Sequence, residues 1–276
     1  MRAIAPGAAT FRAMEWKRTL NAGLERTTRH RLVRTDAAAT EQRPRPRPRR
    51  RGLPRHYDVE AREIIKAVRP NTMTSHHKLF ALIVATRYVV DNAVPGAVVE
   101  CGVWRGGSMQ AVARTLLARG VTDRDLHLFD TFDGMPAPTE VDRRHDGKPA
   151  VEVLARRPDR SGRAWAIAGL DDVRACMAET GYPADRVHFH RGLVQDTIPA
   201  EAPEPIAILR LDTDWYDSTR HELEHLYERV VSGGVLLIDD YGYWQGARQA
   251  VDEFLDHTHA RMLLLPMASG RVAVRA

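Results

Sequence analysis

The sequence contains few cysteines. Of its 276 residues only two are cysteine, Cys101 and Cys176, and the local patterns place the first at a strand end and the second in a helix. This count excludes a small disulfide-stabilised scaffold, and no spacing of cysteine and histidine is typical of a zinc site. We therefore expect a protein of the reducing cytoplasm.

Long apolar runs are also missing. No stretch of about 18 consecutive apolar residues occurs, so no membrane partner or membrane span is expected. The first 40 residues are rich in arginine and alanine but lack the continuous apolar segment of a secretory signal.

Acidic residues are absent from residues 43–55, which read RPRPRPRRRGLPR and carry the basic excess behind the net charge of +5. Alternating arginine and proline favour an extended backbone and cannot bury a core, so residues 1–55 are predicted to be a disordered tail. The charge belongs to this tail, and no nucleic-acid partner is expected for the folded part. The alternative, a basic arm that binds nucleic acid, predicts an affinity that falls steeply with salt.

Beyond the tail, short apolar segments alternate with amphipathic ones. A helix is expected at 76–92, with Thr74 or Ser75 as its N-cap. Further strands are expected at 97–100, 126–130, 187–190, 206–211 and 235–238, further helices at 108–119, 171–180, 218–231 and 243–257, and a hairpin at 262–266 and 271–274. This order predicts an α/β fold, a Rossmann-like, doubly wound, mainly parallel sheet with a terminal antiparallel hairpin.

Three parts follow from this pattern: the tail, an N-terminal helical lid segment at 56–95, and a main domain at 96–276. Residues 133–168 interrupt the main domain with polar sequence that contains proline and glycine. A connection of this length in a compact domain is usually a lid or a disordered insertion.

The first candidate site is ECGVWRGGS, residues 100–108, which ends a strand and opens a helix. A dinucleotide site needs a glycine where Trp104 stands, which disfavours a nicotinamide-dependent oxidoreductase. Glu100 on the strand suits a cationic ligand end, such as the amino and sulfonium groups of S-adenosylmethionine. A tight turn without a ligand is the alternative. Asp130 ends the next strand, where an acid can accept both ribose hydroxyls of a nucleoside-containing cofactor.

The second candidate site is a group of carboxylates at the ends of two later strands. Asp212 and Asp214 follow one strand, and Asp239 and Asp240 follow the other. Like charges this close repel one another unless a cation lies between them. Ligation by oxygen alone selects Mg²⁺, Mn²⁺ or Ca²⁺ over zinc. The alternative is that these acids cap the following helices and pair with arginines.

Five motifs occur in a characteristic order: TMTS from Thr72, ECGVWRGGS, LFDTFDGMP, LRLDTDWYDST and IDDYG. In this order the chain resembles the macrocin (TylF-type) O-methyltransferase family over about residues 57–275. The family includes sugar methyltransferases of macrolide and aminocoumarin antibiotic biosynthesis. The resemblance implies a methyltransferase fold, S-adenosylmethionine as cofactor, and Mg²⁺.

The resemblance also implies roles for single residues. Asp214 is expected as the base near the acceptor hydroxyl, although Asp212 as both ligand and base stays open. The remaining roles are metal ligation by Asp212, Asp239 and Asp240, and cofactor contact by Ser75, Glu100, Gly102, Gly106, Ser108 and Asp130.

The expected acceptor is a glycosylated small molecule with a vicinal diol, because two adjacent hydroxyls can chelate one cation. A catechol-type aromatic diol is the alternative acceptor. A homodimer or higher homo-oligomer is expected.

Overall fold

The computed structural model describes residues 52–155, 165–260 and 262–276. The predicted tail therefore lies outside the described residues except for residues 52–55. Among the described helices, none has the length and apolar character needed to cross a membrane.

Seven strands form one sheet in the order β3-β2-β1-β4-β5-β7-β6. The strands from β1 to β5 pair in parallel, whereas β7 is antiparallel to both β5 and β6. Their bounds are β1 Ala97–Cys101, β2 Leu126–Asp130, β3 Val187–Arg191, β4 Ile206–Leu211, β5 Val230–Ile238, β6 Leu265–Met267 and β7 Gly270–Val274. The predicted fold, a mainly parallel α/β sheet with a terminal hairpin, is confirmed.

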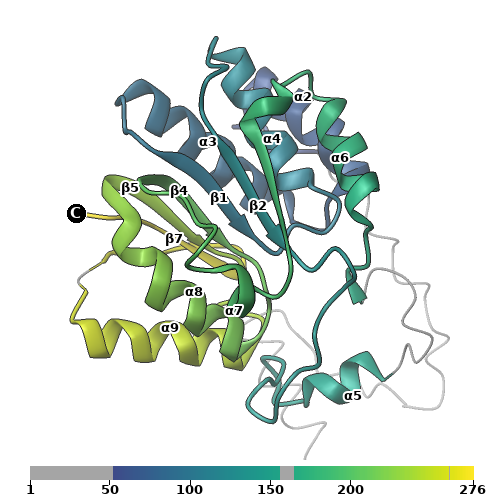
Figure 1. Ribbon diagram of the computed structural model, residues 1–276, viewed down its shortest axis with the longest axis vertical. Coiled ribbons are helices and arrows are strands. Elements are labelled where there is room, and N and C mark those ends of the chain that lie inside the picture. Colours follow the sequence, from purple (N-terminus) through teal and green to yellow (C-terminus); the bar gives the residue numbers. More distant parts are fainter. Residues whose placement is uncertain (1–51, 156–164, 261) are drawn as a thin grey trace, which may run out of the picture. The chain divides into compact units, whose positions relative to one another are not determined.

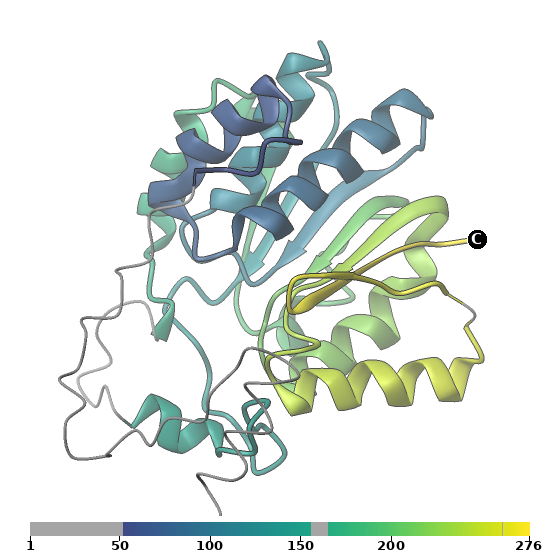
Figure 2. The same ribbon diagram turned by 180° about the vertical axis from the view of Figure 1, so that it is seen from behind.

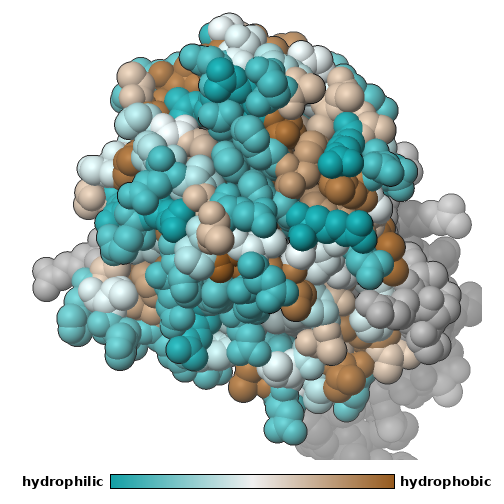
Figure 3. Space-filling model, viewed as in Figure 1, coloured by the Kyte–Doolittle hydropathy of each residue, from teal (hydrophilic) through white to brown (hydrophobic). Residues whose placement is uncertain are grey.

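Helices cover both faces of this sheet (Figures 1 and 2). One face carries α2 Val59–Val68, α3 His76–Asp91, α4 Gly107–Ala118 and α6 Leu170–Ala178, and the other carries α7 Val194–Thr197, α8 Tyr216–Leu226 and α9 Gln245–Thr258. Figure 3 shows hydrophilic side chains over much of the surface seen in Figure 1. This is expected of amphipathic helices whose apolar sides face the sheet.

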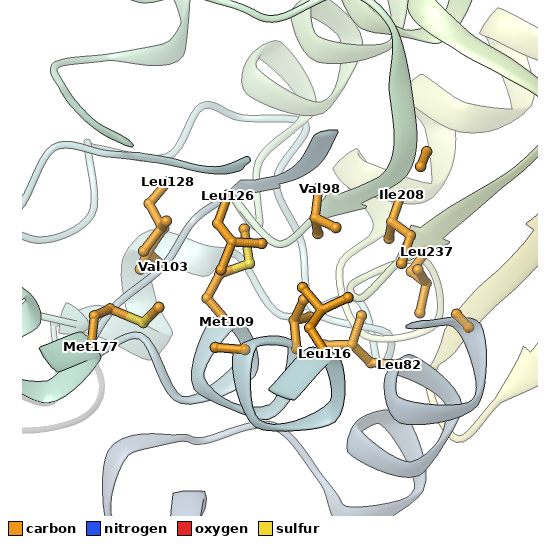
Figure 4. Packing of buried hydrophobic residues seen from close by; sticks show 14 of the residues in the cluster. Leu82, Val98, Val103, Met109, Leu116, Leu126, Leu128, Met177, Ile208 and Leu237 are labelled. Atoms are coloured by element: carbon orange, nitrogen blue, oxygen red, sulfur yellow. The ribbon is translucent and has the colours of Figure 1, made fainter. Parts of the chain in front are cut away.

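The core has two layers because neighbouring residues of a strand point to opposite faces. Val98 of β1 packs with Leu82 of α3 and Leu116 of α4 on one face (Figure 4). Its neighbour Val99 packs on the other face, in the cluster that contains Leu223 of α8. Burial on both faces explains why the central strands β1 and β4 are mostly apolar, whereas the edge strand β3 is only partly buried and carries His188 and His190.

The end of one predicted helix is wrong. The helix predicted to reach residue 231 ends at Leu226, a 3₁₀ turn follows at Tyr227–Arg229, and β5 begins at Val230. Gly233 has a φ of +80°, and the pairing of β5 with β4 shifts register between Ile206 and Ile208. Gly233 and Gly234, which follow the end expected for this helix, therefore lie in an irregular part of β5.

The described part of the predicted lid segment is helical. Asp58 caps α2 by accepting a hydrogen bond from the main-chain N–H of Ala61, and Ser75 caps α3 through the N–H of Lys78. A 3₁₀ turn at Arg69–Asn71 connects the two helices. The buried side of this helix pair packs on α4.

The described parts of the predicted insertion pack against the starts of α8 and α9. A short helix, α5 Ala150–Leu154, contributes Leu154 to a cluster with Trp215 and Trp244. The carboxylate of Asp142, which is fully buried, accepts hydrogen bonds from the N–H groups of Thr139 and Tyr216. Residues 156–164 lie outside the described part.

Candidate active site

A cavity of about 600 Å³ opens at the carboxyl ends of the parallel strands. Each of these strands contributes a residue at or just after its end: Gly102, Asp130, Gly192, Asp212 and Asp239. This edge of an open α/β sheet is where ligands are expected to bind.

Three main-chain hydrogen bonds hold four of these strand ends together, those of β2, β1, β4 and β5. The N–H of Gly102 donates to Phe129 (2.9 Å), that of Asp212 to Cys101 (2.8 Å) and that of Asp239 to Leu211 (2.9 Å). Gly102 has a φ of +83°, and a Cβ atom there would lie 2.1 Å from the main-chain oxygen of Asp212. Only glycine therefore allows β1 and β4 to end so close to each other.

The Asp130 carboxylate fixes the turn after β1. Its Oδ2 accepts hydrogen bonds from the N–H groups of Val103 (2.6 Å) and Trp104 (3.0 Å), and its Oδ1 accepts one from Phe132 (2.8 Å). Asp130 also lines the cavity. It therefore supports the predicted cofactor turn in addition to any contact with a ligand.

Asp212, Asp239 and Asp240 come together as the sequence predicts. Each offers a carboxylate oxygen, and these oxygens lie within 4.8 Å of one another at the cavity wall. Burial and the mutual repulsion of these groups raise the pKa of Asp212 and of Asp240 well above the usual range. Three crowded oxygen donors with excess negative charge fit a hard divalent cation.

Asp214 lies beside this cluster. Its main chain adopts a φ of +67°, and its N–H donates to Oδ2 of Asp240 (3.2 Å). Its own Oδ1 accepts a hydrogen bond from the indole Nε1 of Trp244 (2.6 Å). Burial, assisted by the charge of Asp212, raises the pKa of Asp214 to about 7, a value that suits a group that takes up a proton.

A buried arginine of β4, Arg210, joins the acids and was not among the site residues predicted from the sequence. Its Nη1 donates to Oε1 of Glu100 (2.5 Å) and to Oδ2 of Asp212 (2.8 Å). Its Nη2 donates to Oδ2 of Asp239 (2.5 Å) and to Oγ1 of Thr74 (3.0 Å). The signal was present in the sequence, since a charged residue interrupts an otherwise apolar strand. The alternative that the acids pair with arginines is thus realised in part.

Lys78 was also missed. Its Nζ donates to the main-chain oxygen of Asp239 (2.9 Å) and forms an ion pair with Oδ1 of the same residue. Burial alone would lower the pKa of Lys78, but the carboxylates of Asp239, Asp240 and Asp212 raise it above its usual value. Lys78 therefore stays charged inside the cluster.

The residues predicted to contact a cofactor fall into two groups. Ser75, Gly102 and Asp130 line the cavity, whereas Glu100 and Gly106 do not. Glu100 is 1% exposed and lies behind the wall on Arg210; burial, opposed by this arginine, raises its pKa to about 7. This arrangement does not favour the direct contact with a cationic ligand that the sequence predicts for Glu100.

Ser108 lines a much smaller neighbouring cavity together with Thr74. The N-terminal segment reaches this place because Gly107 has no side chain. A Cβ atom at Gly107 would lie 2.4 Å from the main-chain oxygen of Asn71. Gly107 therefore lets Asn71 and the start of the TMTS segment pass over the start of α4.

The family model described as macrocin-O-methyltransferase (TylF) matches residues 24–268. The chain belongs to this family. The predicted resemblance and the predicted activity, S-adenosylmethionine-dependent O-methyl transfer, are thereby confirmed.

Three relatives of this macrocin-family methyltransferase agree with the assignment. The 8-demethyl-8-(2,3-dimethoxy-alpha-L-rhamnosyl)-tetracenomycin-C 4'-O-methyltransferase of Streptomyces olivaceus is 36% identical over 184 residues, 67% of each chain. The demethyldecarbamoylnovobiocin O-methyltransferase of Streptomyces niveus is 34% identical, over 60% of each chain. The mycinamicin III 3''-O-methyltransferase of Micromonospora griseorubida is 33% identical, over 67% of this chain and 70% of the relative.

Two solved structures resemble the macrocin-family chain. The O-methyltransferase NovP superposes with a TM-score of 0.65 at 31% identity, over 75% of this chain and 82% of NovP. The calicheamicin methyltransferase CalS11 superposes with a TM-score of 0.54 at 23% identity, over 78% of this chain and 91% of CalS11, which supports the fold alone.

Proposed function

We propose that this enzyme methylates one hydroxyl of a vicinal diol on a sugar of a natural product, with Mg²⁺ held by Asp212, Asp239 and Asp240. The observation that carries the proposal is the convergence of these three carboxylates at the cavity wall, with Asp214 beside them. All donors are oxygen, which suits Mg²⁺.

The reaction requires a weakly nucleophilic hydroxyl to lose its proton and to point at the methyl group of the sulfonium. When bound, a hard cation lowers the pKa of a coordinated hydroxyl and orients two adjacent oxygens together. Asp214 accepts the proton, and its hydrogen bond from Trp244 directs the carboxylate. Asp212 as both ligand and base stays the competing assignment.

The cofactor is proposed to lie on the Gly102 side of the cavity, with Asp130 at its ribose hydroxyls and Ser75 covering it. Gly102, Asp130 and Ser75 all line the cavity, which supports this placement. Glu100, Gly106 and Ser108 are proposed to act from behind the wall, where they hold the turn and the TMTS segment.

The acceptor is proposed to carry a large apolar part. Apolar side chains line the same cavity as the carboxylates, among them those of Met73, Trp104, Met135, Pro136 and Leu154. A free monosaccharide has little apolar surface to cover them. The names of the relatives, which include a rhamnosyl-tetracenomycin and a mycinamicin, support a glycosylated acceptor.

The chain is also proposed to work in the cytoplasm as a homodimer or larger homo-oligomer, without a nucleic-acid or membrane partner. Cys101 and Cys176 are both free and buried, as expected of a protein that does not use disulfides.

A panel of acceptors tests the proposal. Methyl transfer from S-adenosylmethionine is measured with Mg²⁺ on a glycosylated vicinal diol, on its analogue that lacks the neighbouring hydroxyl, and on a catechol. We expect kcat/KM on the deoxy analogue to fall by about 100-fold or more, because one chelating oxygen is lost. Equal rates on the diol and the deoxy analogue would refute the chelate, and a preference for the catechol would refute the sugar acceptor.

A further inference from the structure

Lys78 is a buried lysine on an apolar helix face. In α3 it lies on the same side as Leu82, Ala85 and Val89, three residues of the main core cluster. Lys78 is only 8% exposed. A buried ammonium is strongly unfavourable unless anions compensate it, so the position calls for a specific partner.

The partner is Asp239, one of the three acids proposed to hold the metal. The Lys78 Nζ pairs with Oδ1 of Asp239 and donates to its main-chain oxygen (2.9 Å). Oδ2 of the same carboxylate accepts from Arg210 at 2.5 Å. Both carboxylate oxygens of Asp239 are thus bound to cationic side chains.

Lys78 and Arg210 differ in how they reach the acids. Arg210 belongs to the sheet and also binds Glu100 and Asp212, so it is held from several sides. Lys78 reaches Asp239 from α3 at the end of a flexible side chain, and it lines the cavity. It is therefore the cation that can withdraw without a change in the sheet.

We propose that Lys78 is a built-in cation of the carboxylate cluster, whose ammonium a divalent cation must displace from Asp239 in order to bind. The inference rests on the proposed metal site. It gives Lys78 a positioning and competing role: it keeps the acids compensated before the cation arrives, and it lowers their affinity for the cation.

Lys78 also connects the displacement of its ammonium by a divalent cation to the wall of the cavity. It follows the cavity-lining residues Met73, Thr74 and Ser75, and its N–H donates to Oγ of Ser75 (3.4 Å), the N-cap of α3. Withdrawal of the ammonium from Asp239 removes one of the contacts that bind the first turn of α3 to the sheet, while the hydrogen bond from Arg210 to Thr74 remains. Cation binding and the placement of the TMTS segment are therefore coupled.

The test measures Mn²⁺ binding to the full chain without cofactor or acceptor, by electron paramagnetic resonance of the free ion and by calorimetry. Lys78→Met removes the competing charge at similar volume, and we expect its dissociation constant for Mn²⁺ to be lower by about tenfold or more. Lys78→Gln is a second neutral variant in case Lys78→Met does not fold. Lys78→Arg keeps the charge, and Lys66→Met removes an exposed lysine of α2 that pairs with Glu63. Both are expected to bind like the wild type.

The outcomes separate the two proposals. Tighter binding by the neutral Lys78 variants alone supports the competition. If the wild type binds Mn²⁺ and Asp240→Asn does not, but the neutral Lys78 variants bind no more tightly than the wild type, the role of Lys78 is wrong while the metal site stands. If neither the wild type nor the Lys78 variants bind Mn²⁺, the metal site fails and the inference fails with it.

Discussion

The indole Nε1 of Trp244 lies 2.6 Å from Oδ1 of Asp214, so the proposed base has a hydrogen-bond donor fixed on it. Burial and the charge of Asp212 raise the pKa of Asp214, whereas this hydrogen bond lowers it. The net result is a pKa of about 7. A base must be deprotonated to act, so activity falls as the pH drops through this pKa. A bound divalent cation lowers the pKa further and moves the fall below about pH 7.

Trp244→Phe tests this relationship. Loss of a hydrogen bond to a charged group, worth about 1.5–3 kcal/mol, raises the pKa of Asp214 by roughly one to two pH units. The acid limb of kcat/KM against pH is expected to move upward by that amount. Trp215→Phe is the matched control, because the Trp215 indole donates to the main-chain oxygen of Pro136 instead. An unmoved acid limb in Trp244→Phe would favour Asp212 as the base.

Asp130 provides a second test. Asp130→Asn replaces one carboxylate oxygen with an NH₂ group, which cannot accept the main-chain hydrogen bonds that this oxygen receives. We therefore expect affinity for S-adenosylmethionine to fall by about 10- to 100-fold. Titration calorimetry with S-adenosylmethionine and a 2′,3′-dideoxy analogue separates the two roles of the side chain. If Asp130 contacts the ribose, the wild type binds the analogue more weakly, and Asp130→Asn discriminates much less. Equal affinity of the wild type for both ligands would leave Asp130 as a support of the turn only.

The central strands β1 and β4 could be predicted from the sequence because burial on both faces makes each a short, mostly apolar run. The same rule hid Arg210, because a strand is recognised by its apolar majority. Lys78 was missed for another reason: it follows His76 and His77 in the polar first turn of α3. The acids were found because they follow strand ends, where the topology brings them together. The cationic partners of Asp239 come from other elements, Arg210 from β4 and Lys78 from α3. Spacing along the chain does not show that these side chains reach the acid.

The short helix α5 could not be predicted because its stability comes from tertiary contacts. It has five residues, fewer than an isolated helix needs, and packs on Trp215 and Trp244. The start of β5 was missed for a related reason, because glycines after an amphipathic segment usually mark the end of a helix. Gly233 carries a positive φ inside a strand, and only the pairing with β4 shows that the strand continues through it.

Gly102 is predicted to tolerate no side chain. Gly102→Ala combines a φ of +83° with a Cβ atom 2.1 Å from the Asp212 oxygen, whereas Gly120→Ala has a φ of +71° and open space. We expect Gly120→Ala to cost about 1–2 kcal/mol from backbone strain alone. Gly102→Ala is expected to cost at least about 2 kcal/mol more, because the strand ends must separate. Urea unfolding measures both, and equal losses would contradict the close approach.

Glu222 predicts a dependence of stability on pH. It is fully buried on α8, accepts a hydrogen bond from Thr213 (2.8 Å), and burial raises its pKa to about 8. An acid with a raised folded-state pKa binds more protons when folded, so stability falls as the pH rises from about 4.5 to about 8. At about pH 7 the loss relative to acidic pH is roughly 3 kcal/mol.

Glu222→Gln keeps the acceptor for Thr213 and removes the ionisation. Its Tm is expected to exceed that of the wild type at about pH 8, with the advantage shrinking toward about pH 5. Glu140→Gln, at an exposed glutamate, is the control and should follow the wild type. A constant Tm difference between Glu222→Gln and the wild type across this pH range would show that Glu222 does not titrate as described.

Asp212, Asp239 and Asp240 are proposed to hold a divalent cation that the methyl transfer needs. The direct measurement is the rate of methyl transfer from S-adenosylmethionine to a glycosylated diol, by the wild type and by Asp240→Asn, after removal of metal with EDTA and again after addition of excess Mg²⁺. We predict that EDTA reduces the wild-type rate by about 100-fold or more, that Mg²⁺ restores it, and that Asp240→Asn stays inactive at the same Mg²⁺ concentration while it still binds S-adenosylmethionine. An undiminished wild-type rate in excess EDTA would contradict the claim.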